Sequence, residues 1–267
     1  MKFRDIKTKD DLIQYVHQRG RLTKPVEKII DKKYNWDIDL VKNISEHILW
    51  KDIVYKYKFT EEFLETFKMY FNTPCWILLS KHQKLTEKFM RNNFSNLNRW
   101  WVCESQELSE SFIDDYCYEL LWEPISRFQK LSEILIRKYS NKVHWFFISQ
   151  CQTMSEDFIR EFQDEVVWSL ISEYQVLSEP FIDEFKHKVN WYRISKNQVL
   201  SEPFIKKHKK SVSIKNILKN EKCYKLLSDN FYIENFHFIS SNILNKYKRF
   251  MSKDAYNMIR ELFEVQR

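Results

Sequence analysis

The chain repeats one pattern of apolar and polar positions every 23 residues. A glutamine marks each repeat, and three residues after it a serine or threonine is followed by glutamate. The marking residues are Gln83, Gln106, Gln129, Gln152, Gln175 and Gln198. A hydroxyl side chain caps a free N–H group at a helix start, and a carboxylate in the first turn favours the positive end of the helix dipole. The pattern therefore predicts a helix N-terminus in every repeat.

The residues after each predicted cap have the spacing of one helix face. In one repeat Phe158, Ile159, Phe162 and Val166 stand 3, 4, 7 and 11 positions after Ser155. This predicts an α-helix of about three turns with one apolar side. Tryptophan follows two residues later in most repeats, and an aliphatic residue stands three positions beyond it. That spacing predicts a second, shorter helix in each repeat.

A pair of helices this short cannot bury its own aromatic side, so neighbouring repeats must stack and share one core. The sequence therefore predicts an all-α solenoid of stacked two-helix repeats with a period of 23 residues and atypical capping ends. We expect an N-terminal helical cap with degenerate repeats at 1–49, where Thr23 and Trp36 keep the cap-to-tryptophan spacing. A repeat array at 50–217 and a C-terminal helical cap at 218–267 follow. The sequence leaves open whether the last segment is a cap or a separate helical module.

Composition agrees with an all-α chain that has a sizeable core. The 267 residues include one glycine and five prolines, too few for hairpin turns or phosphate-binding loops, whereas 43% are hydrophobic. No run of 18 apolar residues is present, and the first residues lack the features of a signal peptide. We therefore expect a soluble, cytoplasmic protein without a membrane partner.

Cysteine, histidine and glycine form no recognisable catalytic or metal-binding motif. The five cysteines contain no C-x-x-C pair, which argues against a disulfide framework and a zinc site. We expect reduced, mostly buried thiols. The seven histidines share no ligand spacing, and the usual hydrolase, protease and nucleotide-binding motifs are absent. We therefore expect a non-enzymatic protein with no catalytic residue, metal or cofactor, and only a catalytic site assembled from distant residues stays open.

Residues that vary between repeats are the candidates for function, because residues that recur in every layer suit core and capping roles. The predicted second helices carry aromatic residues beyond those that the core requires, together with an arginine. Tyr, Trp and Arg are enriched at protein interfaces, so we predict a partner-binding face. The candidate residues are Trp100, Trp101, Phe128, Phe146, Phe147, Tyr174, Tyr192 and Arg193.

Charged residues at positions 5 and 6 after the cap also change from layer to layer. Asp183 and Glu184 in one repeat are followed by Lys206 and Lys207 in the next. Equivalent positions stack in a solenoid, so the alternation predicts ion pairs between layers, each weak when exposed to water.

Positive charge is concentrated near the C-terminus. The net charge is +7, and residues 205–267 contain 14 basic and 6 acidic side chains. The candidate anion-binding residues, in the segment KKHKKSVSIK, are Lys206, Lys207, Lys209, Lys210 and Lys215. Such a segment can contact phosphate groups without sequence preference. A solvated, lysine-rich helix is the simpler interpretation.

The segments VNWYRISKNQVLSEPFI and VVWSLISEYQVLSEPFIDEF resemble the short tandem-repeat proteins encoded by giant DNA viruses and some large phages. In those proteins a W-x-x-I-S-x-x-Q-x-L-S-E-x-F-I pattern recurs at a similar period. The resemblance covers residues 76–205, with departures at Arg99 and Cys103 in one repeat. It implies a viral origin and a repeat architecture, and carries over no catalytic residue. By analogy with other viral solenoids, it implies that the chain binds and inhibits a host protein, such as a defence component.

The sequence thus favours a non-enzymatic α-solenoid that binds a host protein. Two alternatives stay open: a nucleic-acid-binding protein that acts through the C-terminal lysines, and a sponge that sequesters an anionic nucleotide signal between protomers. The sequence does not determine the identity of the partner, the binding face or the oligomeric state.

Overall fold

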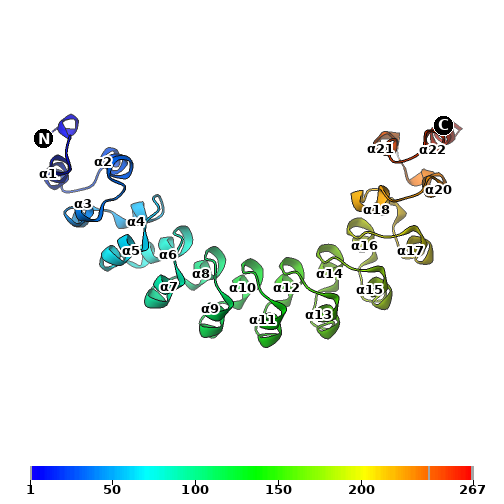
Figure 1. Cartoon of the computed structure of the whole chain (residues 1–267), viewed down its shortest axis with the longest axis horizontal. Helices are drawn as coiled ribbons and strands as arrows, with labels where there is room; N and C mark the ends of the chain where they lie inside the picture. Colours follow the sequence, from blue (N-terminus) through cyan, green and yellow to red (C-terminus); the bar gives the residue numbers. More distant parts are fainter. Residues whose placement is uncertain (1, 240, 266–267) are drawn as a thin grey trace. The chain divides into compact units, whose positions relative to one another are not determined.

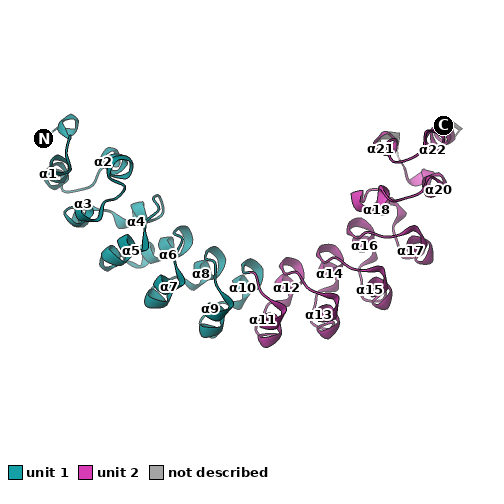
Figure 2. Ribbon diagram, viewed as in Figure 1, with its two compact units in different colours: residues 1–129 teal, residues 130–267 magenta. Residues whose placement is uncertain are grey.

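The computed structural model describes residues 2–239 and 241–265. These residues form 22 α-helices, five short 3-10 or π-helices and no strand (Figure 1). The predicted all-α architecture of stacked two-helix repeats is confirmed. The chain divides into two compact units, residues 1–129 and residues 130–267 (Figure 2). The boundary between the units lies inside the predicted repeat array.

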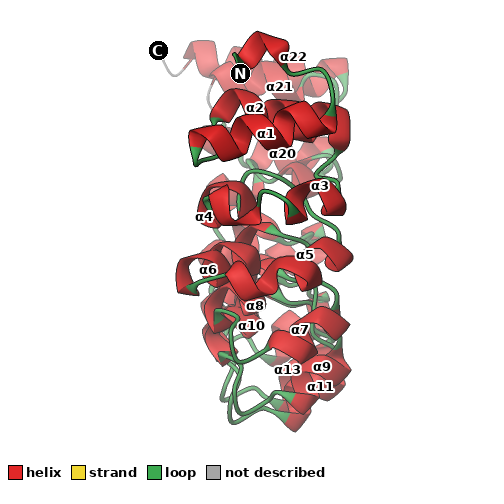
Figure 3. Ribbon diagram, turned by 90° about the vertical axis from the view of Figure 1, so that its left-hand side faces the viewer, coloured by secondary structure: helices red, strands yellow, loops and turns green. Residues whose placement is uncertain are grey.

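Unit 1 starts with helices that depart from the repeat and continues with layers that follow it. The departing elements are η1 (Phe3–Asp5), α1 (Lys9–Arg19), α2 (Lys24–Ile29), η2 (Ile30–Tyr34), α3 (Ile38–Lys42) and η3 (Ser45–His47). The first helices of the layers are α5 (Glu61–Phe67), α7 (Glu87–Asn93) and α9 (Glu110–Asp115). The short helix η4 (Lys68–Tyr70) directly follows α5. The second helices are α4 (Trp50–Val54), α6 (Thr73–His82), α8 (Arg99–Ser105) and α10 (Trp122–Phe128). First and second helices form two separate rows (Figure 3).

Unit 2 has the same two rows and ends in helices that again depart from the repeat (Figure 1). Its first helices are α11 (Glu133–Lys138), α13 (Glu156–Glu161), α15 (Glu179–Glu184) and α17 (Glu202–Lys207). Its second helices are α12 (Trp145–Cys151), α14 (Trp168–Tyr174), α16 (Trp191–Asn197) and α18 (Ile214–Ile217). The closing elements are α19 (Glu221–Tyr224), α20 (Asp229–Glu234), η5 (Phe236–Phe238), α21 (Ser241–Tyr247) and α22 (Lys253–Val265).

The first helix of each full repeat is shorter than its apolar spacing predicts. α13 has six residues and α14 has seven, so the expected order of lengths was wrong. Phe162 leaves the helical conformation, with φ −109° and ψ 31°, although its N–H still bonds the carbonyl of Phe158 at 3.1 Å. The N–H of Val166 then bonds the carbonyl of Phe162 at 3.1 Å. Successive turns therefore keep the helical spacing of the apolar side chains without a continuous helix.

The early repeat predicted from Thr23 and Trp36 does not take the repeat geometry. Thr23 stands at the N-cap of α2, but its side chain makes no capping hydrogen bond. Trp36 has a left-handed φ of 53° and precedes α3 rather than beginning it, because the helical turns of η2 run on to Tyr34. Trp36 is nevertheless only 3% exposed. It therefore packs in the core although its backbone is not helical.

The serine and glutamate of each cap have separate roles. The Ser155 hydroxyl accepts a hydrogen bond from the N–H of Phe158 at 3.2 Å, which confirms the predicted cap. The carboxylate of Glu156 accepts one from the N–H of Ser178, the cap residue of the next layer, at 2.6 Å. The glutamate therefore joins two layers in addition to its place in the first turn.

The repeated glutamines form a row of hydrogen-bonded amides, called here the amide ladder. The Gln175 amide donates to the carbonyl of Gln152 at 2.8 Å and to that of Ser149 at 3.3 Å, and its oxygen accepts from the N–H of Met154 at 3.1 Å. The amide therefore satisfies backbone groups of the preceding layer. After Gln198 the ladder ends, because Asn220 and Cys223 take over the contacts with its carbonyl, at 2.7 and 3.0 Å.

The repeated serine on each second helix bridges two layers. The Ser172 hydroxyl donates to the carbonyl of Trp168 at 2.7 Å and accepts from the N–H of Asn190 in the next layer at 2.9 Å. Ser172 is fully buried, and α14 packs against both α12 and α16. This small residue at a close helix approach therefore also satisfies a buried backbone N–H group.

Aromatic stacking and ion pairs complete the contacts between layers. The ring centroid of Trp168 is 4.8 Å from that of Phe185 in the next repeat. The predicted pairing of charges is present, since the Lys207 ammonium lies 2.8 Å from the carboxylate of Asp183 one layer earlier. Both members are partly exposed, so the pair contributes little free energy and mainly fixes the register of the layers.

Candidate functional site

In unit 2, three of the predicted binding residues expose their rings on the second helices. Phe146 and Tyr192 are the second residues of α12 and α16, and Tyr174 is the last residue of α14. Their exposed fractions are 44%, 61% and 49%. None of the three belongs to the repeated stack of tryptophan and phenylalanine, so their rings are available to a partner.

Two other predicted residues of unit 2 are occupied by contacts within the chain. Phe147 is half-buried, and its ring centroid is 4.9 Å from that of His144. The guanidinium of Arg193 forms an ion pair with Glu173 of α14. Arg193 therefore links two layers, and it can meet a partner only at the edge of that ion pair.

In unit 1, the predicted residues on α8 and α10 differ in how freely they are presented. Trp100 is 38% exposed, and its indole N–H donates to the Glu104 carboxylate at 2.6 Å. Trp101 is half-buried under the Lys81 ammonium, 3.8 Å from the ring centroid. Phe128 is 41% exposed at the end of α10. Trp100 and Phe128 are thus the more accessible rings of unit 1.

The sequence reasoning missed two exposed apolar residues beside the second helices of unit 2. Val176 and Val199 each follow a glutamine of the amide ladder and are 89% and 48% exposed. The signal was present, because the same position varies between charged and apolar residues along the chain. The residues at this position in the earlier repeats are Lys84, Glu107, Lys130 and Thr153. A position that tolerates such changes faces water.

The structure does not bring the five candidate lysines together in one place. Lys206 and Lys207 end α17, and Lys209 and Lys210 lie in the turn that follows it. Lys215 belongs to α18, in the other row of helices (Figure 1). Lys207 is paired with an aspartate of the preceding layer. The remaining exposed lysines at the end of α17 have no ion pair among the described residues.

His208 takes the place that phenylalanine holds in the two preceding repeats. Its ring centroid is 4.5 Å from that of Phe204 and 4.8 Å from that of Trp191. Its Nε2 atom lies 3.0 Å from the carboxylate of Asp183. The hydrogen bond from Lys207, and more weakly the charge of His208, lower the pKa of Asp183. The histidine thus belongs to the stack between layers rather than to an open cluster of basic groups.

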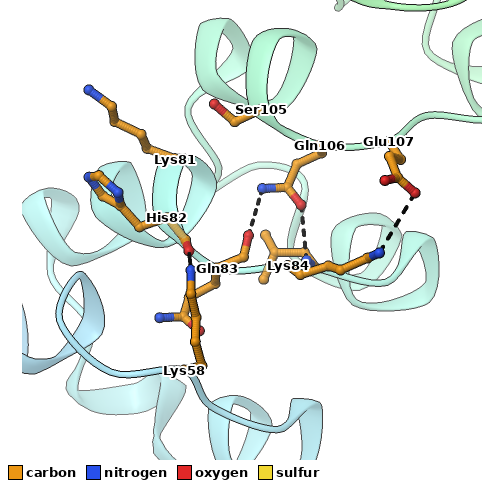
Figure 4. Close-up of a pocket in the computed structure, with 9 residues that line it drawn as sticks. Lys58, Lys81, His82, Gln83, Lys84, Ser105, Gln106 and Glu107 are labelled. Carbon is orange, nitrogen blue, oxygen red and sulfur yellow. Dashed lines mark hydrogen bonds and ion pairs between the residues drawn. The ribbon is translucent and has the colours of Figure 1, made fainter.

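A small basic cavity of about 290 Å³ lies in unit 1 (Figure 4). The Lys58 ammonium donates to the carbonyl of His82, and Lys84 lies 3.7 Å from the carboxylate of Glu107. Lys81 points to the opposite side from Lys84. Burial, together with the charges of Lys81 and Lys58, lowers the pKa of His82. The lysine ammonium groups therefore do not converge on one point, as a compact anion would require.

The described residues contain no group of three or more histidine, cysteine, aspartate or glutamate side chains placed to hold a metal ion. All five cysteines are free thiols, and four of them are buried, as predicted, whereas Cys151 is exposed. In the part of the chain that the structure describes, no helix combines the length and the apolar character needed to cross a membrane.

Comparisons of the chain with protein-family models, with curated proteins and with solved structures found no match.

Proposed function

We propose that this chain is a virus- or phage-encoded helical-repeat module that binds and inhibits a host protein in the host cytoplasm, without catalysing a reaction. The observation that carries the proposal is that repeated residues join the layers, whereas variable aromatic residues are exposed. The repeated glutamine, serine and tryptophan side chains make the contacts between layers. The rings of Phe146, Tyr174 and Tyr192 are exposed outside these contacts.

Exposed aromatic rings on short, rigid helices suit protein recognition. Each ring offers a large contact area and loses little side-chain entropy on binding. Stacked layers hold Phe146 and Tyr192 at equivalent positions two repeats apart, so the rings are presented in a fixed order. A partner with matching apolar recesses would therefore find a preorganised surface.

The test is capture of a partner from host-cell lysate by the tagged full chain, with and without nuclease. We expect a discrete host protein that survives nuclease treatment. The triple variant Phe146→Ala, Tyr174→Ala and Tyr192→Ala should lose it. The matched control, Ile134→Ala with Met258→Ala, removes exposed apolar side chains elsewhere in unit 2 and should retain it. Retention by the triple variant, or recovery of no discrete protein, would contradict the proposal.

A second candidate function is nucleic-acid binding at the end of α17. The observation that favours it is that Lys206, Lys209 and Lys210 are exposed without an acidic partner among the described residues. Some exposed basic residues of unit 2 are paired across layers, as Lys188 is with Asp164 at 2.8 Å, whereas these three lysines lie close together in the chain and are unpaired. Unpaired lysines release counterions when they contact phosphate groups, so this binding would depend strongly on salt.

A further inference from the structure

A cleft of about 510 Å³ in unit 2 lies between the turn after α11 and the turn after α13. Trp145 lines it: its ring centroid is 4.9 Å from that of Phe162, and its indole N–H donates to the carbonyl of Ser140 at 3.0 Å. Glu165 also lines the cleft, and its exposed carboxylate has no ion pair or hydrogen bond among the described residues. The cleft thus combines a fixed aromatic ring with an unpaired negative charge.

The next layer repeats this arrangement 23 residues later. The ring centroid of Trp168 is 4.8 Å from that of Phe185, and the indole N–H donates to the carbonyl of Gln163 at 2.8 Å. One arginine–glutamate ion pair borders each of the two places. These pairs are Arg137–Glu161 and Arg160–Glu184. The two places therefore serve as internal controls for each other.

The two places differ at the residue that completes them. Lys188 stands where the preceding layer has Glu165. The Lys188 ammonium lies 5.8 Å from the ring centroid of Trp168, and it donates to the side chains of Gln163 at 3.0 Å and Asp164 at 2.8 Å. The chain's own cation thus occupies the second place, beside the tryptophan ring.

We propose that the cleft beside Trp145 and Glu165 binds a basic side chain of another protein, held as Lys188 is held one layer later. A tryptophan face attracts an ammonium or guanidinium group, and Glu165 supplies the opposite charge. The side-chain oxygen of Asn141 takes the place of the Asp164 carboxylate as an acceptor.

The charges around the cleft select against other occupants. No lysine or arginine is among the residues that line it. Two of its three carboxylates are already paired, Glu161 with Arg137 and Asp164 with Lys188. An anion would meet the remaining charge of Glu165, and an apolar group would bury that charge without a partner, which is costly. A cation satisfies it.

This site adds a basic residue to what the proposed host partner must offer, and it rests on the proposed function only in taking the occupant to be a protein. The test uses small probes and therefore does not depend on the partner. The full chain is titrated with N-acetyl-lysine methylamide and N-acetyl-arginine methylamide, and the indole N–H resonances of Trp145 and Trp168 are followed by NMR. N-acetyl-norleucine methylamide is the uncharged control.

We expect a saturable shift of the Trp145 resonance with either cationic probe, and none with norleucine or at Trp168. Glu165→Gln should weaken binding roughly fivefold, because one ion pair is lost beside the ring. Glu165→Lys should abolish the response, since the chain then fills the cleft with its own ammonium. Lys188→Glu should open the second place and give Trp168 a response of its own.

Equal shifts with norleucine, an unchanged affinity in Glu165→Gln, or no Trp145 shift with either cationic probe would overturn the inference. All three variants change exposed side chains, and their folding is checked by circular dichroism. Failure to capture a host protein would leave these titrations unaffected. A captured partner together with a silent Trp145 would refute the cleft alone.

Discussion

The side-chain amide of Gln198 donates a 2.7 Å hydrogen bond to the main-chain carbonyl of Gln175, the residue that holds the same place one layer earlier. The same amide donates to the carbonyl of Ser172 at 3.1 Å, and its oxygen accepts from the N–H of Leu177 at 3.1 Å. One side chain thus satisfies three buried backbone groups. The glutamine recurs because each interface between layers leaves the same groups unpaired.

Removal of one amide from the ladder should destabilise unit 2. Gln175→Leu leaves the N–H of Met154 and the carbonyls of Ser149 and Gln152 without their partner, at a cost of about 2–4 kcal/mol. Urea unfolding followed by circular dichroism measures the change. The control Val176→Ala alters the exposed neighbour and should shift the free energy of unfolding by less than about 0.5 kcal/mol. Equal losses in the two variants would contradict the role of the ladder.

The bridging serine should be replaceable by cysteine but not by valine. Cys103 holds this position in one layer of unit 1, where burial raises the pKa of its thiol to about 11 and the backbone N–H of Leu121 contacts it. Ser172→Cys should therefore cost about 1 kcal/mol. Ser172→Val leaves the N–H of Asn190 unpaired and should cost roughly 2–4 kcal/mol. Thermal unfolding of both variants measures the two losses of stability. A valine variant as stable as the cysteine variant would disprove the role of the hydroxyl as a bridge between layers.

Adjacent residues on α16 should separate folding from binding. Trp191 donates from its indole N–H to the carbonyl of Lys186 at 2.9 Å and stacks 4.8 Å from His208, so Trp191→Ala should cost about 3 kcal/mol. Tyr192→Ala should change stability by less than about 0.5 kcal/mol and weaken partner capture. Denaturant unfolding and quantitative pull-down give the two readouts. A Tyr192 variant that binds normally would remove this residue from the proposed surface.

Acid should remove the contribution of Asp183 to the stability of the folded chain. Lys207 lowers the pKa of this carboxylate in the folded chain, so its stabilising effect is present above the unfolded-state pKa of about 4. The effect is lost as the pH falls through the folded-state value. The difference in Tm between the parent and Asp183→Asn should be largest near neutral pH and vanish in strong acid. Glu119→Gln removes an exposed carboxylate that has no ion pair or hydrogen bond in the described part of the chain, and it should show no such trend.

Salt should report whether the lysines at the end of α17 bind nucleic acid. The triple variant Lys206→Gln, Lys209→Gln and Lys210→Gln should lower affinity for single-stranded DNA and reduce the slope of log affinity against log salt by about 2. Fluorescence anisotropy at several salt concentrations measures both quantities. The control neutralises three lysines that lie on or after α18, namely Lys215, Lys219 and Lys222. Equal effects of the two variants, or an affinity independent of salt, would exclude this candidate.

The spacing of residues along the chain predicted some helix caps and helices correctly and others wrongly, each for a physical reason. The cap at Ser155 was predictable because a side chain and a backbone group three residues apart decide it. The length of α13 was not, because a helix and a run of turns give Phe162 and Val166 the same spacing. Trp36 shows the same limit, since its distance from Thr23 equals the cap-to-tryptophan spacing of the repeats, but the π-helical turns between them shift it off the helix.

The candidate surface was predictable only as a list of variable positions. Sequence variation separates Tyr192 from Trp191, but it cannot tell that Arg193 is engaged by Glu173. It likewise gives no sign that the Lys81 ammonium covers the ring of Trp101. These outcomes depend on the side chains that neighbouring layers bring into contact.

The sequence by itself determined the 23-residue period, the two-helix repeat and the all-α fold, because caps and apolar stripes are set by residues close together in the chain. Only the tertiary structure decided which backbone groups the repeated glutamines satisfy. Only the tertiary structure shows that Lys188 fills the place beside Trp168, while Glu165 leaves the equivalent place beside Trp145 open. The physical reason is that each of these contacts joins groups from different layers, whose distances the fold alone fixes.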